Sequence, residues 1–600
     1  MPVIDSEEQD SDTTVNRRRI LQALGTTTVA GLAGCSGTGS NGGNTAGSND
    51  ELGERVPTQT LAYWTGLGGT TATLETMAPV VQKNLQDRLG VDVEVQGREL
   101  TAVLGSAMGD KREYDMILGT NAPDPSRLDP TEVLGMYEAG RAGAGNPGNI
   151  ANYADCSYTE FSQQQRTTID EAERADLIHS AIQQFSEDVG VIAISPRVIA
   201  GAWHPDQVSV GGHDSGAGMD PLNPYVYYES EATDGDTVVS NANAVMVSTT
   251  NFPTVASPRI HIIWSHLINS PLVEYDDSLE LRNVLAEEYT ASEDGTTITV
   301  TLHDDATFHN GDPVTAEDVR FTYKLLWDNA DAYPQVTAMP YESIEAVDET
   351  TVEFNMKNPT PVLFTKVWPR WGILHKESWK PAMENPAEFS LDTDNIIGSG
   401  PFQVDSFRQG QMIQLSPYGD HPVFNPKSRQ VMQVFQGSES VFRAFQNGQI
   451  SMILMQGMDT ITRIRDEMEN AKTHTQDSYL GAQIWPQHSY GATKFLKFRQ
   501  AAGAVLDRQQ MIAQAQYGEV DPSLYPTIFR GSHPSLPSED QLYKHTDDPA
   551  GNEERGRQLL REAGWGWDNN GRLHYPPDAD LTPLWPQGES PSPEEYPCLQ

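Results

Sequence analysis

The stretch VLAEEYTASEDGTTITVTLHDDATFHNGDPVTAEDVRFTYKLL, residues 284–326, carries the local signals that decide the fold around it. Asn310 and Gly311 form a tight-turn pair, because both residue types tolerate positive φ. Thr315 lies three residues before Asp318, which is the spacing of a capping box that opens a helix. The stretch therefore predicts a strand, a turn and a helix, placed past the middle of the chain.

The length of the chain sets the number of lobes. Six hundred residues are too many for one hydrophobic core, so two or three lobes are expected, and a hydrophobic content of 37% is enough to fill them. After the first forty positions the sequence has no run of eighteen or more apolar residues. We therefore expect a soluble body after the start of the chain.

The charge balance is strongly acidic. The chain has 84 Asp and Glu against 40 Lys and Arg, a formal net charge of -44, which disfavours nucleic acid as a partner on Coulomb grounds. The acidic residues are scattered through segments with strand patterns, which argues against a disordered acidic tail. Concentrated salt would screen this self-repulsion, because the Debye length falls to about 3 Å at 1 M. We infer a salt-loving source; the alternative is an acidic protein from an ordinary habitat.

The first 57 residues have the composition of a targeting and anchoring segment. Residues 1–35 contain three consecutive arginines and then a modest apolar run, too short to span a bilayer, which resembles a twin-arginine export signal. LAGC, ending at Cys35, resembles a lipobox, in which Cys35 would be lipidated. Residues 36–57 are rich in Gly, Ser and Asn and predict a flexible tether. Together these features predict a lipid-anchored protein on the extracellular face of the cell membrane.

Two more cysteines lie in the body of the chain, Cys156 and Cys598. They could pair in an oxidising exterior, but nothing in the sequence decides this. Of the two alternatives, we expect free buried thiols.

Six segments after residue 236 form an ordered pattern. They are the opening stretch, YESIEAVDETTVEFNMKNPTPVLF, IIGSGPFQVDSF, SVFRAFQNGQISMI, FRQAAGAVLDRQQMI and RGRQLLREAGWGWDNNGRL. In this order the six segments resemble the family 5 extracellular solute-binding proteins, which are the dipeptide-, oligopeptide- and nickel-binding components of ABC importers.

The last third of this family pattern comes first in the chain. YDMILGTNAPDPSRLDP resembles the family's loop with its Asp-Pro, and the strands and helices on either side of that loop resemble its closing part. The order predicts a circular permutation, which is tolerated where the old termini lie close together. The alternative is a separate N-terminal domain left from a tandem pair.

The resemblance implies an α/β fold, a bilobal clamp like the periplasmic binding proteins with an enlarged first lobe. It also implies a ligand, a small molecule or peptide, that is delivered to permease subunits with separate ATPase subunits. We expect a monomer that binds no cofactor, no metal and no nucleic acid. The expected parts after the tether are lobe two, first part, 58–203; a connector, 204–235; lobe one with its extra subdomain, 236–490; and lobe two, second part, 491–600.

The resemblance also gives candidate ligand contacts. In peptide-binding members, an Asp in a Gly-Trp-x-x-Asp loop pairs with the free amino group of the ligand. The shared Asp-Pro places Leu118 at the Trp and Asn121 at that Asp, and Asp124 follows before Pro125. Because Asn121 is neutral it cannot form the ion pair, which keeps sugars and modified peptides open. Asp124 serves either the ligand or the turn.

Aromatic residues in the connecting segments are further candidates. Trp264, Trp371 and Trp485 could line a cleft, since ligand sites are mostly apolar with a few polar groups. The alternative is packing in the core or on a lobe surface.

Other functions remain as alternatives. The sequence has no P-loop, no His-Glu-x-x-His, no Gly-x-Ser-x-Gly and no Cys-x-x-Cys, so we do not expect an enzyme. A nickel site at His303 and His309 is a weaker alternative. A receptor that presents its ligand to a membrane sensor would have the same fold and a different partner.

Overall fold

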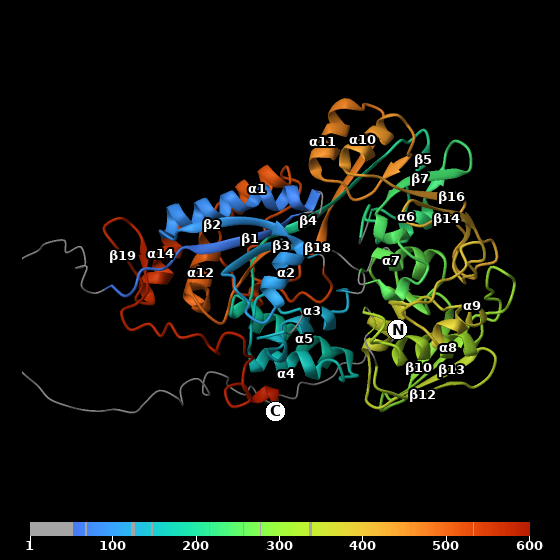
Figure 1. Cartoon of the computed structure of the whole chain (residues 1–600), viewed down its shortest axis with the longest axis horizontal. Helices are drawn as coiled ribbons and strands as arrows, with labels where there is room; N and C mark the ends of the chain where they lie inside the picture. The colour runs from blue at the N-terminus through green and yellow to red at the C-terminus, as the bar shows by residue number, and fades with distance from the viewer. Residues whose placement is uncertain are drawn as a thin grey trace, which may run out of the picture. The chain divides into compact units, whose positions relative to one another are not determined.

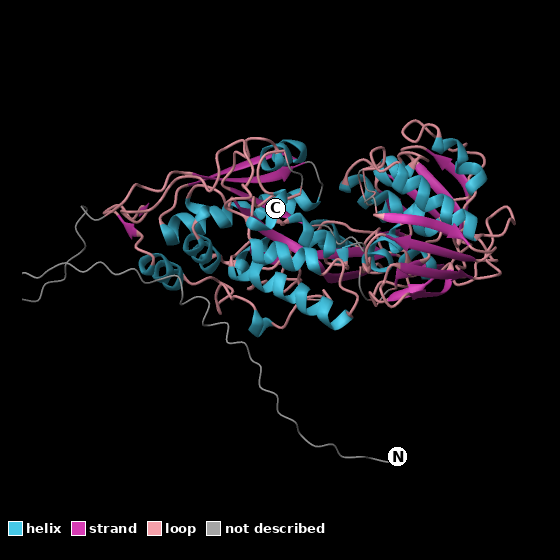
Figure 2. Ribbon diagram, turned by 90° about the horizontal axis from the view of Figure 1, so that it is seen from below, coloured by secondary structure: helices cyan, strands magenta, loops and turns pink. Residues whose placement is uncertain are grey.

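The computed structural model describes residues 52–65, 69–121, 127–145, 148–214, 217–255, 257, 259–276, 278–334, 336, 339–531 and 533–600. Helices and strands are interspersed along this part of the chain (Figure 1; Figure 2), which confirms the α/β prediction. Within the same ranges, no helix has the length and apolar character to cross a membrane. The predicted export signal, the lipobox with Cys35 and residues 36–51 of the predicted tether lie outside the described residues.

The largest sheet has ten strands in the described chain. At one edge of the sheet β15 pairs antiparallel with both β14 and β16, whereas at the other edge β1 pairs parallel with both β2 and β3. The spatial order is β14 (Phe402–Arg408), β15 (Met412–Pro417), β16 (Arg429–Val434), β7 (Thr237–Ala242), β17 (Met452–Ile453), β4 (Ile192–Trp203), β18 (Lys472–Pro486), β3 (Met116–Thr120), β1 (Gln59–Thr65) and β2 (Val93–Glu99).

Two long antiparallel strands, β4 and β18, connect the two main hydrophobic cores. Ile192 of β4 and Trp485 of β18 belong to the first core. The opposite end of β4 reaches the second core through Trp203 and a small third core through Ala202, and Ala471, just before β18, also packs against the third core. The pairing register shifts between Asp477 and Gly481. A Cβ at Gly481 would lie 2.0 Å from the carbonyl oxygen of Ser195, so the close approach of the strands requires glycine.

The first core is built from both ends of the described chain, Val56 to Ile194 and Tyr479 to Tyr575. Arg88 Nη1 ties the two parts together, donating to the carbonyl of Val505 at 2.9 Å. In Figure 1 the blue and the red elements accordingly lie together. The principal helices of this core are α1 (Gly69–Asn84), α5 (Glu171–Glu187), α12 (Leu496–Val505), α13 (Arg508–Ala515) and α14 (Glu553–Glu562).

The second core lies within residues 208–454 and includes the apolar residues of 284–326. Gly311 has a φ of 88°, and its N–H donates to the carbonyl of Phe308 at 2.8 Å, so the predicted turn is present. The predicted capping box joins Thr315 and Asp318 at the start of α8. A four-stranded antiparallel sheet packs with α8 (Ala316–Asp328) and has the order β10 (Ala286–Ala291), β11 (Thr297–Leu302), β13 (Thr351–Met356) and β12 (Tyr341–Ala346).

Shorter elements complete the described chain. The remaining α-helices are α2 (Leu100–Met108), α3 (Thr131–Met136), α4 (Cys156–Gln164), α6 (Tyr225–Glu229), α7 (Arg259–His261), α9 (Lys376–Trp379), α10 (Ser438–Gln446) and α11 (Met458–Glu467). The two-stranded pairs are β5 (Val208–Ser209) with β6 (Glu231–Ala232), β8 (Val273–Tyr275) with β9 (Leu281–Asn283), and β19 (Gly566–Trp567) with β20 (Leu573–His574).

The expectation of free thiols is wrong. The C-terminal segment returns to the start of α4, which brings the Cα atoms of Cys156 and Cys598 to 5.4 Å, and the two sulfurs form a disulfide. That separation lies within the range that a disulfide requires. The bond fixes the last residues of the chain against the first core.

Candidate functional site

The loop that the family resemblance singled out follows β3. Leu118 lies inside that strand with no exposed surface and pairs with Ile484 of β18. Asn121 follows the strand and is partly buried, and its backbone N–H donates to the carbonyl of Gly481 at 3.3 Å. Asp124 lies outside the described residues. Asn121 is therefore the member of this set whose described side chain retains some exposure.

The three candidate tryptophans fall into two different cores. Trp485 packs in the first core, where its indole N–H donates to the hydroxyl of Tyr137 at 2.7 Å. Trp264 and Trp371 lie in the second core, with ring centroids 6.0 and 6.2 Å from Phe252. None of the three is more than 3% exposed, so the structure does not gather them on one surface. Their contact with a ligand stays a prediction.

Two arginines converge at the end of the strand crossing. Arg197 lies on β4 and Arg259 begins α7, and the Nη2 atom of each contacts the sulfur of Met455, at 3.3 and 3.4 Å respectively. Arg197 Nη2 also donates to Thr70 Oγ1, at 3.4 Å, near the start of α1. A thioether is only a weak, uncharged acceptor. Two positive charges therefore face the same neutral atom.

One carboxylate accompanies this pair. Asp220 has no exposed surface; its Oδ1 accepts the N–H of Leu222 at 2.9 Å, and its Oδ2 has no hydrogen-bond partner among the described residues. Burial lowers the pKa of Arg197, the charge of Asp220 opposes that change, and the charge of Arg259 adds to it. Together, Arg197, Arg259 and Asp220 therefore carry one more positive than negative charge.

Further polar atoms of this cluster lack partners in the described part of the chain. They are the Nη1 of Arg259 and the hydroxyl of Tyr227, in addition to the Oδ2 of Asp220. Burial raises the pKa of Tyr227, Asp220 raises it further and Arg259 opposes the change, so this hydroxyl stays protonated and can donate. Unpaired buried groups are costly, which makes them good anchors for an incoming ligand. We call Arg197, Asp220, Tyr227, Arg259 and Met455 the arginine site.

The chemistry of the arginine site suits an anionic group with two oxygens. A guanidinium binds a carboxylate through short, charge-assisted hydrogen bonds, often two at a time. One such anion would balance the extra positive charge and provide acceptors for the donors that lack them. Sequence reasoning missed the site because its members are far apart in the chain. One signal was present: both arginines follow a Ser-Pro pair, and each precedes apolar residues, in ISPRVIA and SPRIHII.

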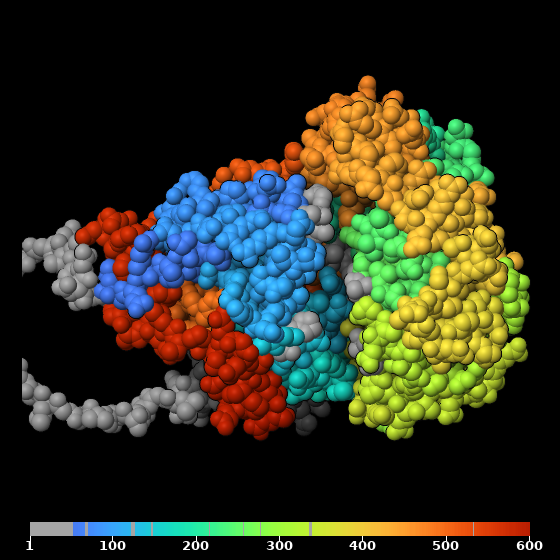
Figure 3. Space-filling view, viewed as in Figure 1, coloured from blue at the N-terminus to red at the C-terminus, as the bar shows by residue number. Residues whose placement is uncertain are grey.

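A second polar contact joins the first core to the second. Asp129 is 2% exposed, and its Oδ2 accepts from Arg174 Nη2 at 2.7 Å and from the hydroxyl of Thr365, which belongs to the π-helix Leu363–Val367. Burial alone would raise the pKa of Asp129, but Arg174 and the hydrogen bonds from Thr131 and Thr365 outweigh it, so the pKa is lowered. We call Asp129, Arg174 and Thr365 the Asp129 bridge. In the space-filling view the surface is hollowed between the two sides that this bridge connects (Figure 3).

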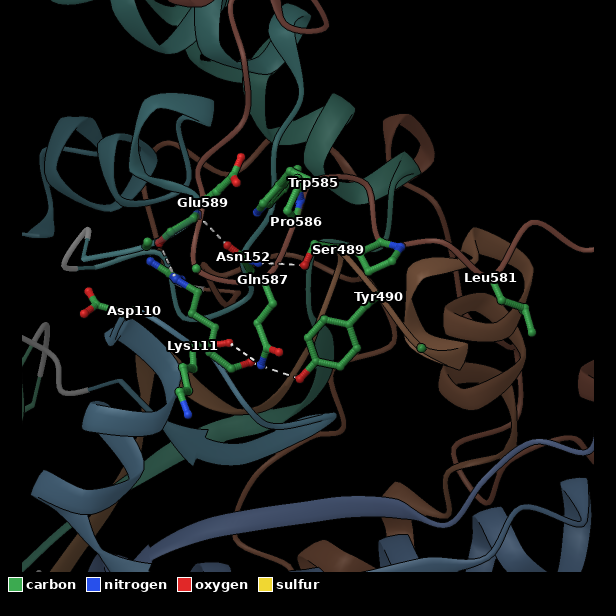
Figure 4. Close-up of a pocket in the computed structure, with 16 residues that line it drawn as sticks. Asp110, Lys111, Asn152, Ser489, Tyr490, Leu581, Trp585, Pro586, Gln587 and Glu589 are labelled. Carbon is green, nitrogen blue, oxygen red and sulfur yellow. Dashed lines mark hydrogen bonds between the residues drawn. The ribbon is translucent and has the colours of Figure 1, made fainter.

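A cavity of about 340 Å³ lies elsewhere, in the first core beside the C-terminal segment (Figure 4). Its polar groups already bond to one another: Asn152 Nδ2 donates to Ser489 Oγ at 2.9 Å, and Gln587 Nε2 donates to the carbonyl of Lys111 at 3.1 Å. Tyr490 donates its hydroxyl hydrogen to a neighbouring backbone carbonyl. Because these groups are satisfied without a ligand, the arginine site is the stronger candidate.

The nickel alternative at His303 and His309 is wrong. His309 Nε2 lies 2.9 Å from the carbonyl of Gly400, and its Nδ1 accepts the N–H of Gly398 at 3.2 Å. Both ring nitrogens are thus engaged with the backbone, so neither can bind a metal ion. Burial lowers the pKa of His309 to about 4, as expected for a structural histidine.

Comparison with known proteins identifies the family. Residues 280–600 match the family described as bacterial extracellular solute-binding proteins, family 5 Middle. This match covers more than half of the chain, and the chain therefore belongs to that family.

Several curated relatives of this chain are named as peptide-binding proteins. A putative ABC transporter peptide-binding protein of Brucella ovis is 25% identical over 305 residues, 50% of this chain and 56% of the relative. The oligopeptide-binding protein AppA of Bacillus subtilis is 26% identical over 313 residues, 51% of this chain and 55% of the relative. A probable D,D-dipeptide-binding periplasmic protein of Escherichia coli is 31% identical over 197 residues, 32% and 37% of the two chains. The chain thus spans about half the length of the first of these curated relatives.

Solved structures give a weaker likeness. NikA from Brucella suis in complex with Fe(III)-EDTA has a TM-score of 0.44 at 21% identity, over 58% of this chain and 68% of that one. The oligopeptide-binding protein AppA from Bacillus subtilis in complex with a nonapeptide has a TM-score of 0.41 at 20% identity, over 58% and 67%.

Proposed function

We propose that this chain is the extracellular solute-binding component of an ABC importer and that its ligand carries a carboxylate, as a peptide does at its C-terminus. Family membership and the peptide-binding names of the relatives support the first part. The second part depends on one observation: Arg197 and Arg259 converge on the uncharged sulfur of Met455 with Asp220 as the accompanying carboxylate. The ligand carboxylate would accept from both guanidinium groups.

Binding would be coupled to closure of the two cores. A ligand shifts a hinge only if it binds the closed state more tightly than the open one. Arg197 lies on a crossing strand and contacts Thr70 of the first core, while Arg259 belongs to the second-core side, so an anion held by both would favour closure. The Asp129 bridge adds a contact between the same two cores. Permease subunits would then accept the closed form, and separate ATPase subunits would drive transport.

The amino end of the ligand would be recognised less strictly. Asn121 is partly buried at the end of β3 and can donate or accept a hydrogen bond, but it cannot neutralise an ammonium group. We therefore propose that peptides with a blocked amino terminus still bind, whereas those with a blocked carboxyl terminus do not. Asp124, Leu118, Trp264, Trp371 and Trp485 stay secondary candidates for ligand contact.

We also propose the remaining features that the sequence indicated. The body would be exported through the twin-arginine route, anchored by a lipid on Cys35 outside the cell, monomeric, adapted to high salt and not an enzyme. A circular permutation of the family pattern is supported by the first core, in which residues before 195 pack with residues after 478. The family's role in solute binding supports the absence of catalysis.

A thermal-shift screen tests the proposal. The purified chain in molar potassium chloride would be melted with short peptides, with their N-acetyl and C-terminal amide forms, with sugars and with Ni²⁺. A ligand present at about 100 times its Kd adds about 2.7 kcal/mol to the free energy of unfolding. We expect stabilisation by free-acid and N-acetylated peptides and none by the amides. Stabilisation by sugars alone, or turnover of an added substrate, would contradict the proposal.

A further inference from the structure

A cluster of metal-ligating side chains lies beside the strand crossing, apart from the arginine site. His474 is on β18, in register with Gly201 of β4. His213 and Asp214 belong to the connector between β5 and α6. One potential ligand atom from each of these three side chains lies within 4.8 Å of the others. Two imidazoles and a carboxylate from distant parts of the sequence are thus already gathered.

The distances within the cluster suit a shared ion. His213 Nε2 and Asp214 Oδ1 are 3.3 Å apart. Neighbouring ligand atoms around an ion with bonds of about 2.0–2.1 Å lie roughly 2.8–3.0 Å apart in octahedral and roughly 3.3–3.4 Å apart in tetrahedral geometry. The imidazole rings of His213 and His474 have centroids 4.9 Å apart and planes at 84°, so their edges face each other without stacking.

Neighbouring groups orient the two imidazoles. His474 Nε2 lies 3.0 Å from Gln476 Oε1, so this nitrogen carries the proton and Nδ1 keeps its lone pair. His213 Nε2 faces Asp214 and is therefore the candidate ligand atom of this ring, whereas its Nδ1 is buried and has no hydrogen-bond partner among the described residues. The ring of Trp203 packs edge-on against His213 with centroids 5.2 Å apart. An amide that fixes a tautomer and an apolar wall are typical surroundings of a metal ligand.

We propose that His213, Asp214 and His474 bind one divalent transition-metal ion, of the Zn²⁺, Ni²⁺ or Cu²⁺ type. Imidazole with one carboxylate suits these ions, whereas Mg²⁺ and Ca²⁺ prefer oxygen ligands alone. Three protein ligands leave at least one position for water. The ion would join the connector to β18, and the same connector carries Asp220 of the arginine site. Metal binding would therefore fix one wall of that site.

Calorimetric titration of ZnCl₂ and NiCl₂ into the purified chain without a histidine tag tests this proposal. The buffer contains about 1 M KCl, because a Debye length of about 3 Å screens weak attraction of cations to the acidic surface. We expect one ion per chain, and Kd at least tenfold higher in His213→Gln and in His474→Gln. Asp214→Asn also weakens binding; the Asp214 side chain is 87% exposed, so this variant leaves the fold unchanged.

His179→Gln is the matched control, because it removes one imidazole from helix α5 of the first core and leaves the cluster intact. X-ray absorption of the bound ion should report two imidazole nitrogens, and thermal melts without metal should show that the variants fold. Three results would overturn the proposal: unchanged affinity in His474→Gln and Asp214→Asn, an equal loss in His179→Gln, or displacement of the ion by millimolar Mg²⁺.

Discussion

Replacing Arg259 with Met should abolish tight binding of a carboxylate ligand and leave the empty protein as stable as before. Arg259 Nη1 has no partner among the described residues, and its Nη2 contacts only the weakly accepting sulfur of Met455 there. A hydrogen bond to a charged group contributes about 1.5–3 kcal/mol. Each such bond lost from the ligand therefore raises Kd roughly 10- to 150-fold.

The stability of the ligand-free variant separates binding from structure. Arg259 adds to the lowered pKa of Arg197, which means that the two positive charges repel each other. Removing one of them should leave the free energy of unfolding unchanged or slightly higher. Isothermal titration with a free-acid peptide gives Kd, and urea unfolding gives stability. Arg98→Met, on the exposed end of β2, is the control because it changes net charge equally.

The outcome that refutes this reasoning is specific. If Arg259→Met binds the peptide as tightly as the unchanged protein, the arginine site does not hold the carboxylate. If the ligand-free variant loses several kcal/mol of stability, Arg259 has a structural role and the excess of positive charge is compensated in another way.

Three further predictions concern the frame of the clamp. Asp129→Asn leaves Arg174 without its buried partner and should cost about 3–5 kcal/mol in urea unfolding, and a loss under 1 kcal/mol would contradict the bridge. Because the folded pKa of Asp129 is lowered, the unchanged protein should also lose stability as pH falls below about 4. Replacing both cysteines, Cys156→Ser with Cys598→Ser, should lower the free energy of unfolding by about 2–4 kcal/mol and expose the C-terminal segment to protease. Equal protection from protease with and without the disulfide would show that the bond does not hold this segment in place. Burial lowers the pKa of His309 and of His533 to about 4, so as pH falls the unfolded chain binds protons before the folded protein does. Thermal stability should therefore fall as pH drops from about 6.5 to 4. A constant melting temperature over that range would contradict the burial of these two imidazoles.

Local structure could be predicted from the sequence where it depends on neighbours in the chain. The turn at Asn310-Gly311 and the capping box of Thr315 with Asp318 involve groups within a few residues of one another, and both are present. The family resemblance likewise depends on ordered local segments, and the family match covers most of them.

Contacts between distant segments could not be predicted in the same way. Cys156 and Cys598 are separated by 442 residues, and only the return of the C-terminal segment to α4 brings them together. Tryptophan in an apolar segment looks the same whether it lines a cleft or fills a core, and Trp264 and Trp485 are fully buried. Arg197 and Arg259 share only the preceding Ser-Pro, a pattern with no fixed meaning before the fold places both beside Met455.

The central claim is that a ligand carboxylate lies between Arg197 and Arg259, and a double-mutant cycle with the ligand tests it most directly. Kd is measured by titration for one peptide as free acid and as C-terminal amide, each with the unchanged protein and with Arg259→Met. We expect amidation to weaken binding at least tenfold in the unchanged protein and by a smaller factor in Arg259→Met, because the variant keeps only Arg197 of the two guanidinium partners of the carboxylate. An equal penalty for amidation in both proteins would contradict the claim.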